Sequence, residues 1–110
     1  MEIKDKITIA TDFSETPGAR YYKDGDFPGE QFLQEVLLPK FEMAVKGEYI
    51  LLIDLDKVWG YPSSFVSGSF GKLSVMKGAD LILKYITFKS EDNSMRLERI
   101  LSEIKKPRKK

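Results

Sequence analysis

The sequence contains no cysteine and no histidine. These absences exclude disulfides, thiolate nucleophiles, Ser-His-Asp triads, Cys-His dyads and ordinary structural zinc sites, so no metal site is predicted. Long apolar runs are also missing, since none approaches the roughly 18 residues that a helix needs to cross a bilayer. The segment MEIKDKITIA at the N-terminus lacks the apolar core of a signal peptide. We therefore expect a cytoplasmic protein with no membrane contact.

The remaining composition is that of one small folded domain. The chain has 110 residues, of which 42% are hydrophobic and 12% aromatic. This length suffices for one modest core and is too short for two ordinary domains. The aromatic content argues against a disordered chain. We predict one domain over residues 1–104, followed by a basic tail over residues 105–110 that we expect to be disordered.

Positive charge is concentrated in that tail, where five of the last six residues are basic. The whole chain has a net charge of +1, but residues 1–104 carry thirteen basic and seventeen acidic side chains, a net charge of −4. A folded body of that sign argues against a nucleic-acid-binding surface. Any affinity for polyanions is expected to be weak and to reside in the tail, which is otherwise a solvated terminus.

The first half of the chain predicts a strand, a turn-rich loop and a helix. Residues 3–13 alternate between two faces and are rich in β-branched side chains, which favours a strand. The following loop contains a short segment, residues 19–23, that could pair as a further strand. Apolar side chains then recur at helical spacing from Gly29 to about Lys46, and Pro39 should bend or break this helix.

The second half alternates between strands and helices. The apolar run 49–53 predicts a central strand buried on both faces. Ser63 or Ser64 is a candidate N-cap of a helix that stops at Gly78. Residues 81–88 predict another strand, and Ser90 is expected to cap a final helix that reaches residue 104. The fold class is therefore α/β, with a mixed β-sheet covered by helices.

Two hydroxyl side chains, Ser63 and Ser64, follow the buried strand at the start of a helix. Backbone N–H groups and the helix dipole favour an anion at such a position, which suits a phosphoserine or a bound phosphate. The simpler interpretation is that one of the serines only caps the helix. The spacing alone does not decide between the two.

A second group of polar residues lies in the turn-rich loop. Arg20 is a candidate for binding an anionic group, and Glu30 is a candidate acceptor or ion-pair partner of Arg20. A local ion pair combined with turn chemistry explains the same residues. The spacing singles out neither an acid-base pair for catalysis nor a Mg²⁺ site at Asp54 and Asp56.

The single tryptophan, Trp59, lies in the loop after the central strand. Large aromatic side chains with a polar atom are frequent in protein interfaces, so Trp59 is a candidate contact residue. A lone tryptophan that covers the edge of the core is the alternative.

The segment ILLIDLDKVWGYPSSFVSGSFGKL resembles the central signature of STAS domains, the fold of sulphate transporters and anti-sigma-factor antagonists. The match consists of an apolar strand, Asp54, Leu55 and Val58, and the serine pair Ser63 and Ser64 before a helix. Phe65 after the serines, the later Phe70-Gly71, and the upstream TPGAR and GDFPGEQF are similar to the branch of STAS-like domains of unknown function. The resemblance spans about residues 7–90.

This resemblance implies a regulatory module and not an enzyme. In anti-sigma-factor antagonists a partner kinase of the GHKL ATPase type, similar to histidine kinases, phosphorylates the first serine of the pair, which here is Ser63. Phosphate at a helix start adds about −1.5 to −2 charge to the contact surface and can exclude an acidic partner. No cofactor is expected. The candidate interaction surface comprises Asp56, Trp59, Tyr61, Pro62, Phe65 and Ser67.

An alternative function uses the same helix start. A module that binds a nucleotide or another phosphate ligand would hold the anion between Ser63 and Arg20.

Overall fold

The computed structural model describes residues 1–107, and within that range three strands form one sheet in the order β1-β2-β3. The strands are β1 (Ile3–Thr8), β2 (Ile50–Asp54) and β3 (Ile86–Lys89). Both strand pairs are parallel, with Ile53 placed between Ile7 and Phe88. The predicted α/β class is confirmed. The expected mixed sheet is instead parallel over the described residues, because a helical crossover separates each strand from the next.

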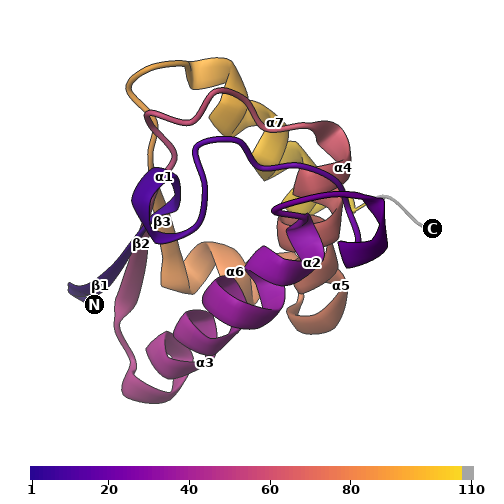
Figure 1. Cartoon of the computed structure of the whole chain (residues 1–110). Helices are drawn as coiled ribbons and strands as arrows, with labels where there is room; N and C mark the ends of the chain where they lie inside the picture. Colours follow the sequence, from indigo (N-terminus) through magenta and orange to yellow (C-terminus); the bar gives the residue numbers. More distant parts are fainter. Residues whose placement is uncertain (108–110) are drawn as a thin grey trace.

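Helical segments make up most of the remainder (Figure 1). They are α1 (Ile9–Asp12), the 3₁₀ turn η1 (Tyr22–Asp24), α2 (Gly29–Phe32), η2 (Leu33–Leu37), α3 (Leu38–Gly47), α4 (Ser63–Val66), η3 (Ser67–Gly71), α5 (Lys72–Lys77), α6 (Ala79–Tyr85) and α7 (Ser94–Lys105). The segments η2 and η3 are π-helical. They join α2 to α3 and α4 to α5, so that each trio forms one continuous helix.

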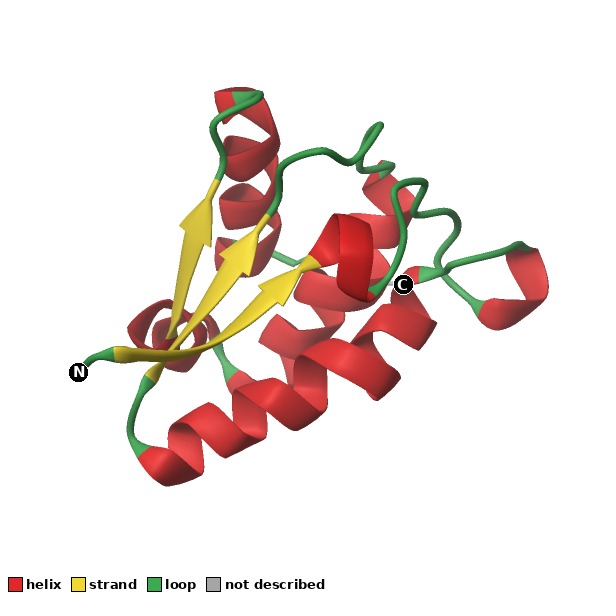
Figure 2. Cartoon of the chain, turned by 60° about the vertical axis from the view of Figure 1, so that its left-hand side comes forward, coloured by secondary structure: helices red, strands yellow, loops and turns green. Residues whose placement is uncertain are grey.

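The helices gather on one face of the sheet, which is in front of them in Figure 2. Strand-to-strand crossovers in parallel sheets are right-handed, so a sheet in sequential order places successive crossovers on the same face. Leu51 and Ile53 of β2 point to the helices and are fully buried, whereas Ile50 and Leu52 are only half-buried. The prediction that β2 is buried on both faces is therefore wrong.

Residues 81–88 are mostly helical and not the predicted strand. The helix α6 occupies Ala79–Tyr85, and only the following residues form β3. Ile82 and Tyr85 are buried while Leu83 and Lys84 are exposed. This is the i, i+3 pattern of a helix face and not the alternation of a strand.

The N-terminal predictions also need correction. The first strand ends at Thr8, and the chain turns at once into the short helix α1. Residues 19–23 do not pair as a strand, since their last part belongs to η1. Gly29 and Glu30 instead donate backbone hydrogen bonds to the carbonyl oxygens of Ala19 and Arg20.

Pro39 neither ends nor separates the helix that contains it. It lies at the start of α3, directly after the π-helical segment η2. Proline lacks the N–H of an intrahelical bond, and its ring crowds the preceding turn of an α-helix. Here the preceding turn is the wider π-helical segment, which lies where the ring would otherwise clash. The helix therefore continues from Gly29 to Gly47, as the apolar periodicity predicts.

Close packing explains the small residues on the helix that begins at Ser63. A Cβ atom on Gly68 would lie 2.9 Å from Cγ of Arg20, and one on Gly29 would meet the carbonyl oxygen of Phe65. The turn-rich loop and α2 thus lie directly against α4 and η3. Gly68 has no room for a larger side chain because the side chain and backbone of Arg20 occupy that space.

The core lies between the sheet and the helices. Its fully buried members of largest volume are Phe32, Phe41, Phe65, Phe70, Ile7, Ile9, Leu37, Leu51, Ile53, Leu55, Leu73 and Ile82. The helix α7 ends at Lys105, one residue into the predicted tail. The remaining positions of that tail from 108 to 110 lie outside the described residues.

Asn93, and not Ser90, caps α7. Its side-chain oxygen accepts a hydrogen bond of 2.9 Å from the N–H of Met95, whereas the Ser90 hydroxyl donates to the carbonyl of Asn93. Asn93→Ala should cost about 1 kcal/mol, because one helix N–H loses its acceptor, and should lower the Tm by roughly 5 °C in a thermal melt. Ser90→Ala is the matched control, and an equal or larger loss there would contradict this assignment.

Candidate functional site

The helix that begins at Ser63 presents one exposed serine. Pro62 occupies the N-cap position with an extended backbone, and neither Ser63 nor Ser64 makes a capping hydrogen bond. The expectation that a serine caps this helix is therefore wrong. Ser63 is exposed and Ser64 is half-buried. Of the two candidate phosphoacceptors, Ser63 is the more accessible to another protein.

The loop before this helix is held in place at its backbone. The N–H of Trp59 donates to the carbonyl of Glu15 at 2.8 Å, and Arg96 donates to the carbonyl oxygens of Val58 at 2.7 Å and Trp59 at 3.1 Å. The side chain of Trp59 nevertheless remains 82% exposed. A large aromatic side chain on a fixed backbone is a preorganised contact, and it does not cover the core.

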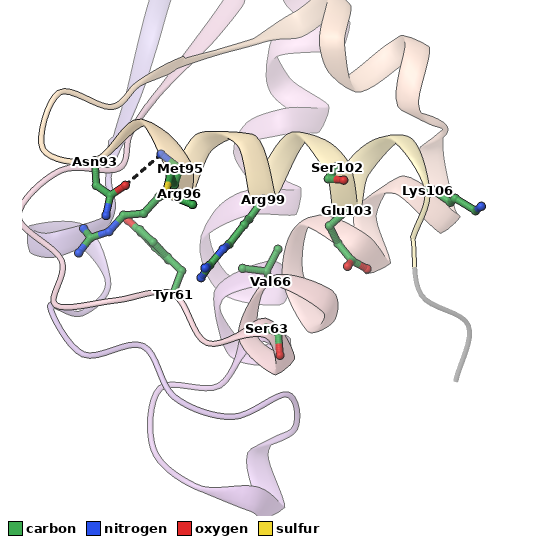
Figure 3. Close-up of a pocket in the computed structure, with 10 residues that line it drawn as sticks. All are labelled: Tyr61, Ser63, Val66, Asn93, Met95, Arg96, Arg99, Ser102, Glu103 and Lys106. Atoms are coloured by element: carbon green, nitrogen blue, oxygen red, sulfur yellow. Dashed lines mark hydrogen bonds between the residues drawn. The ribbon is translucent and has the colours of Figure 1, made fainter.

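Ser63 lies at the edge of a groove of about 460 Å³ between α4 and α7, here called the α4–α7 groove. Figure 3 shows its lining, with α7 crossing above the start of α4. The residues are Tyr61, Ser63, Val66, Asn93, Met95, Arg96, Arg99, Ser102, Glu103 and Lys106. A groove of this size can hold a small ligand or a few side chains of a partner.

The α4–α7 groove contains three cations and one carboxylate. The guanidinium of Arg96 is engaged with two carbonyl oxygens and lies 5.7 Å from the ring centre of Tyr61. The side chains of Arg99 and Lys106 make no hydrogen bond or ion pair with any of residues 1–107. The carboxylate is that of Glu103, which is buried. The groove therefore has a positive net charge.

Three of the expected surface residues are buried. Phe65 is fully buried among the rings of Phe13, Phe32 and Tyr61, and Ser67 lies beneath the turn-rich loop. Asp56 is 5% exposed. These three side chains cannot form a contact surface in this conformation, whereas Pro62 and Trp59 are exposed.

Tyr61 is half-buried, and its hydroxyl is used in a hydrogen bond to the backbone. Its hydroxyl donates to the carbonyl of Leu55 at 2.8 Å. Burial raises the pKa of the Tyr61 hydroxyl well above its usual value, against a smaller opposing effect of Arg96. The hydroxyl therefore stays protonated at neutral pH and remains a donor.

Asp54, Asp56 and Lys89 form an ionic cluster at the carboxyl ends of β2 and β3. The ammonium of Lys89 lies 3.6 Å from Asp54 and 3.4 Å from Asp56. One oxygen of Asp56 accepts from the N–H groups of Glu91 at 2.7 Å and Asp92 at 2.9 Å. These bonds hold the loop before α7 against the loop after β2. Among residues 1–107 no group of three or more acidic side chains is arranged to hold a metal ion.

Arg20 and Glu30 do not meet Ser63, and no ion pair joins them within the described part of the chain. Glu30 accepts from the N–H of Tyr22 at 3.0 Å, and Arg20 packs over Gly68 in a second groove beside α5. Arg20 and Ser63, which the alternative function would use together, therefore line different grooves. The cations near Ser63 come from α7 instead.

Sequence reasoning missed Arg96, Arg99 and Lys106. Their spacing of i, i+3 and i+10 places them on one side of α7, which is the signal that could have found them. The spacing could not show that α7 packs beside α4, because the two helices are brought together only by the tertiary fold.

A family model described as the STAS-like domain of unknown function (DUF4325) matches residues 28–96. The chain belongs to this family. The match covers the helix from Gly29, the central strand and the serine pair, so the predicted resemblance is confirmed there, while TPGAR lies outside it. No protein of curated function and no solved structure matches the chain.

Membership of the STAS-like family indicates a regulatory role similar to that of anti-sigma-factor antagonists. STAS-like domains are generally not catalysts. Within residues 1–107 the domain has no helix both long and apolar enough to span a membrane.

Proposed function

We propose that this STAS-like domain is a non-catalytic regulatory module that binds a protein partner through the surface around Trp59 and Ser63. The observation that carries the proposal is that both side chains are exposed and that Glu15 and Arg96 fix the backbone of Trp59. A fixed loop loses little conformational entropy when it binds, so its exposed side chains can contribute most of their contact energy.

We further propose that phosphorylation of Ser63 controls this binding. The kinase would be a histidine-kinase-like ATPase of the GHKL type. It would transfer the γ-phosphoryl group of ATP to Oγ of Ser63, with release of ADP and of the hydroxyl proton. The phosphate adds about −1.5 to −2 charge beside Trp59, which changes both the shape and the charge of the contact surface. The exposure of Ser63 supports this step, because a kinase must reach the hydroxyl.

The prediction is that Ser63→Asp weakens partner binding at least tenfold, while Ser63→Ala retains it. Tagged versions of both variants would be purified from the native host, with quantitative mass spectrometry of partners and of phosphate on Ser63 and Ser64. Ser64→Asp tests the second serine. Thr11→Asp, at an exposed hydroxyl in α1, controls for added negative charge.

An equal loss of the partner with Thr11→Asp would contradict a role specific to Ser63. Recovery of the same partner at the same level with Ser63→Asp would contradict the switch. In that case Trp59→Ala would still test the binding surface, since removal of a central aromatic contact commonly costs 2 kcal/mol or more.

A further inference from the structure

The α4–α7 groove concentrates positive charge on an otherwise acidic domain. Residues 1–107 carry fifteen basic and seventeen acidic side chains, a net charge of −2, yet the groove contains three cations and a single carboxylate. A hollow of opposite sign to its surroundings attracts anions and raises their local concentration. No described acidic side chain pairs with Arg99 or Lys106. Their charges are available to a ligand.

Arg99 is the cation placed at the Ser63 end of the groove. Arg96 bonds to the carbonyl oxygens of Val58 and Trp59 and so fixes this side of α7 against the loop that leads to Ser63. Arg99 follows three residues later on the same helix face. Figure 3 shows its side chain extending from α7 into the groove towards α4. The side chain is thus directed by α7, although its guanidinium has no partner in the part of the chain that the structure describes.

The carboxylate of the groove, Glu103, lies between Arg99 and Lys106 along α7 in Figure 3. A Cβ atom on Gly71 would be 2.6 Å from an oxygen of Glu103, so Glu103 lies against the end of η3. Eight residues separate Ser63 from Gly71, which is about 12 Å along a helix. That separation exceeds the Debye length of roughly 8 Å at physiological salt. Glu103 therefore repels an anion at Ser63 only weakly, and its repulsion of an anion at Arg99, one helical turn away on α7, is opposed by Arg99 itself.

We propose that Arg99 is the receptor for a phosphate monoester bound in the α4–α7 groove. The planar guanidinium presents paired N–H donors that match two phosphate oxygens, and on Arg99 none of these donors is bonded to any of residues 1–107. The phosphate has two possible sources. One is phosphorylated Ser63 of the same chain, in which case the inference rests on the proposed function. The other is a separate phosphorylated small molecule.

Phosphorylated Ser63 would reach Arg99 by rotation about its own side chain. The Ser63 hydroxyl points away from α7 in Figure 3. An exposed serine exchanges among three staggered rotamers, and attraction to the guanidinium favours the rotamer that faces α7. The phosphate would then join α4 to α7 and close the groove beside Trp59.

The first test uses the full chain with phosphoserine installed at position 63, followed by ³¹P NMR across pH 4–8. Arg99 should lower the pKa of the phosphate's second ionisation by roughly half a unit or more from its usual value near 6. Arg99→Gln should abolish this shift. Lys105→Gln, an exposed cation of α7 outside the groove, should leave the shift in place.

The second test uses the unmodified chain, titrated with inorganic phosphate and with phenyl phosphate at constant ionic strength. Saturable ¹⁵N NMR shifts at Ser63 and Arg99 that disappear in Arg99→Gln would assign the site to a separate ligand. A shifted phosphoserine without such binding would assign it to Ser63. An ordinary phosphoserine pKa together with no Arg99-dependent binding of either probe would overturn the proposal.

Both tests are independent of the partner and of the kinase, because the phosphoserine is installed synthetically. Failure of Ser63→Asp to release a partner would remove the proposed function and leave the Arg99 site intact. The side chain of Arg99 makes no bond to the described chain, so Arg99→Gln should fold as the parent domain does, which circular dichroism would verify.

Discussion

Phe65→Ala is expected to destabilise the domain by about 3–5 kcal/mol, enough to unfold much of it at 37 °C. Phe65 is fully buried, and its ring centre lies 6.0 Å from that of Phe13 and 5.7 Å from that of Phe32. Removal of the ring leaves a cavity between α2 and α4 and also removes these ring contacts. Urea unfolding monitored by circular dichroism would measure the loss.

Trp59→Ala is the matched control, because it removes an aromatic ring that is 82% exposed. Its effect on stability should stay within about 0.5 kcal/mol. In the proposed function it should weaken partner binding, whereas Phe65→Ala should affect binding only through loss of folded protein. Similar stability losses in the two variants would contradict the placement of one ring in the core and the other in solvent.

The sequence predicts the elements whose apolar pattern is unambiguous. Residues 50–53 of the predicted strand lie in β2, and the periodic stretches after Gly29 and Ser63 are helices. The prediction fails where a short apolar run fits both the helix and the strand periodicity, as in residues 81–88. Most of these residues form a helix and not a strand, because the helix places both Ile82 and Tyr85 in the core, which is a result of tertiary packing.

The candidate site is predictable in part for a different reason. Ser63 and Trp59 follow the central strand directly, so a local motif is enough to place them on the surface. Phe65 and Asp56 belong to the same motif, but their burial depends on α2 and on the loop before α7, which are distant in sequence. The basic lining of the α4–α7 groove likewise arises only when α7 packs against α4.

Asp56→Ala is the second change with a large expected effect, a loss of roughly 2–4 kcal/mol. The Asp56 carboxylate is almost fully buried, and the N–H groups of Glu91 and Asp92 both donate to it. Alanine leaves these donors without an acceptor and removes a partner of Lys89. Asp24→Ala, at an exposed position in η1, should change stability by less than about 0.5 kcal/mol.

The same carboxylate should make the domain sensitive to acid. Burial by itself would raise the pKa of Asp56, but the N–H groups of Asp92 and Glu91 and the nearby Lys89 outweigh burial and hold that pKa below its usual range. A carboxyl group whose pKa is lower in the folded state stabilises the fold fully above its unfolded pKa of about 4. That contribution is lost as the pH falls through the lowered folded pKa.

Urea unfolding at pH 7, 4.5 and 3 would therefore show a stability difference between the parent domain and Asp56→Ala that is constant down to about pH 4.5 and smaller at pH 3. At pH 7 Asp56→Asn should lower the free energy of unfolding by less than Asp56→Ala does, because the amide oxygen of asparagine can still accept from the two N–H groups. A difference that stays constant down to pH 3 would refute the lowered pKa. Since Asp56 fixes the loop that leads into α7, its loss should also displace Arg99 and weaken phosphate binding in the α4–α7 groove.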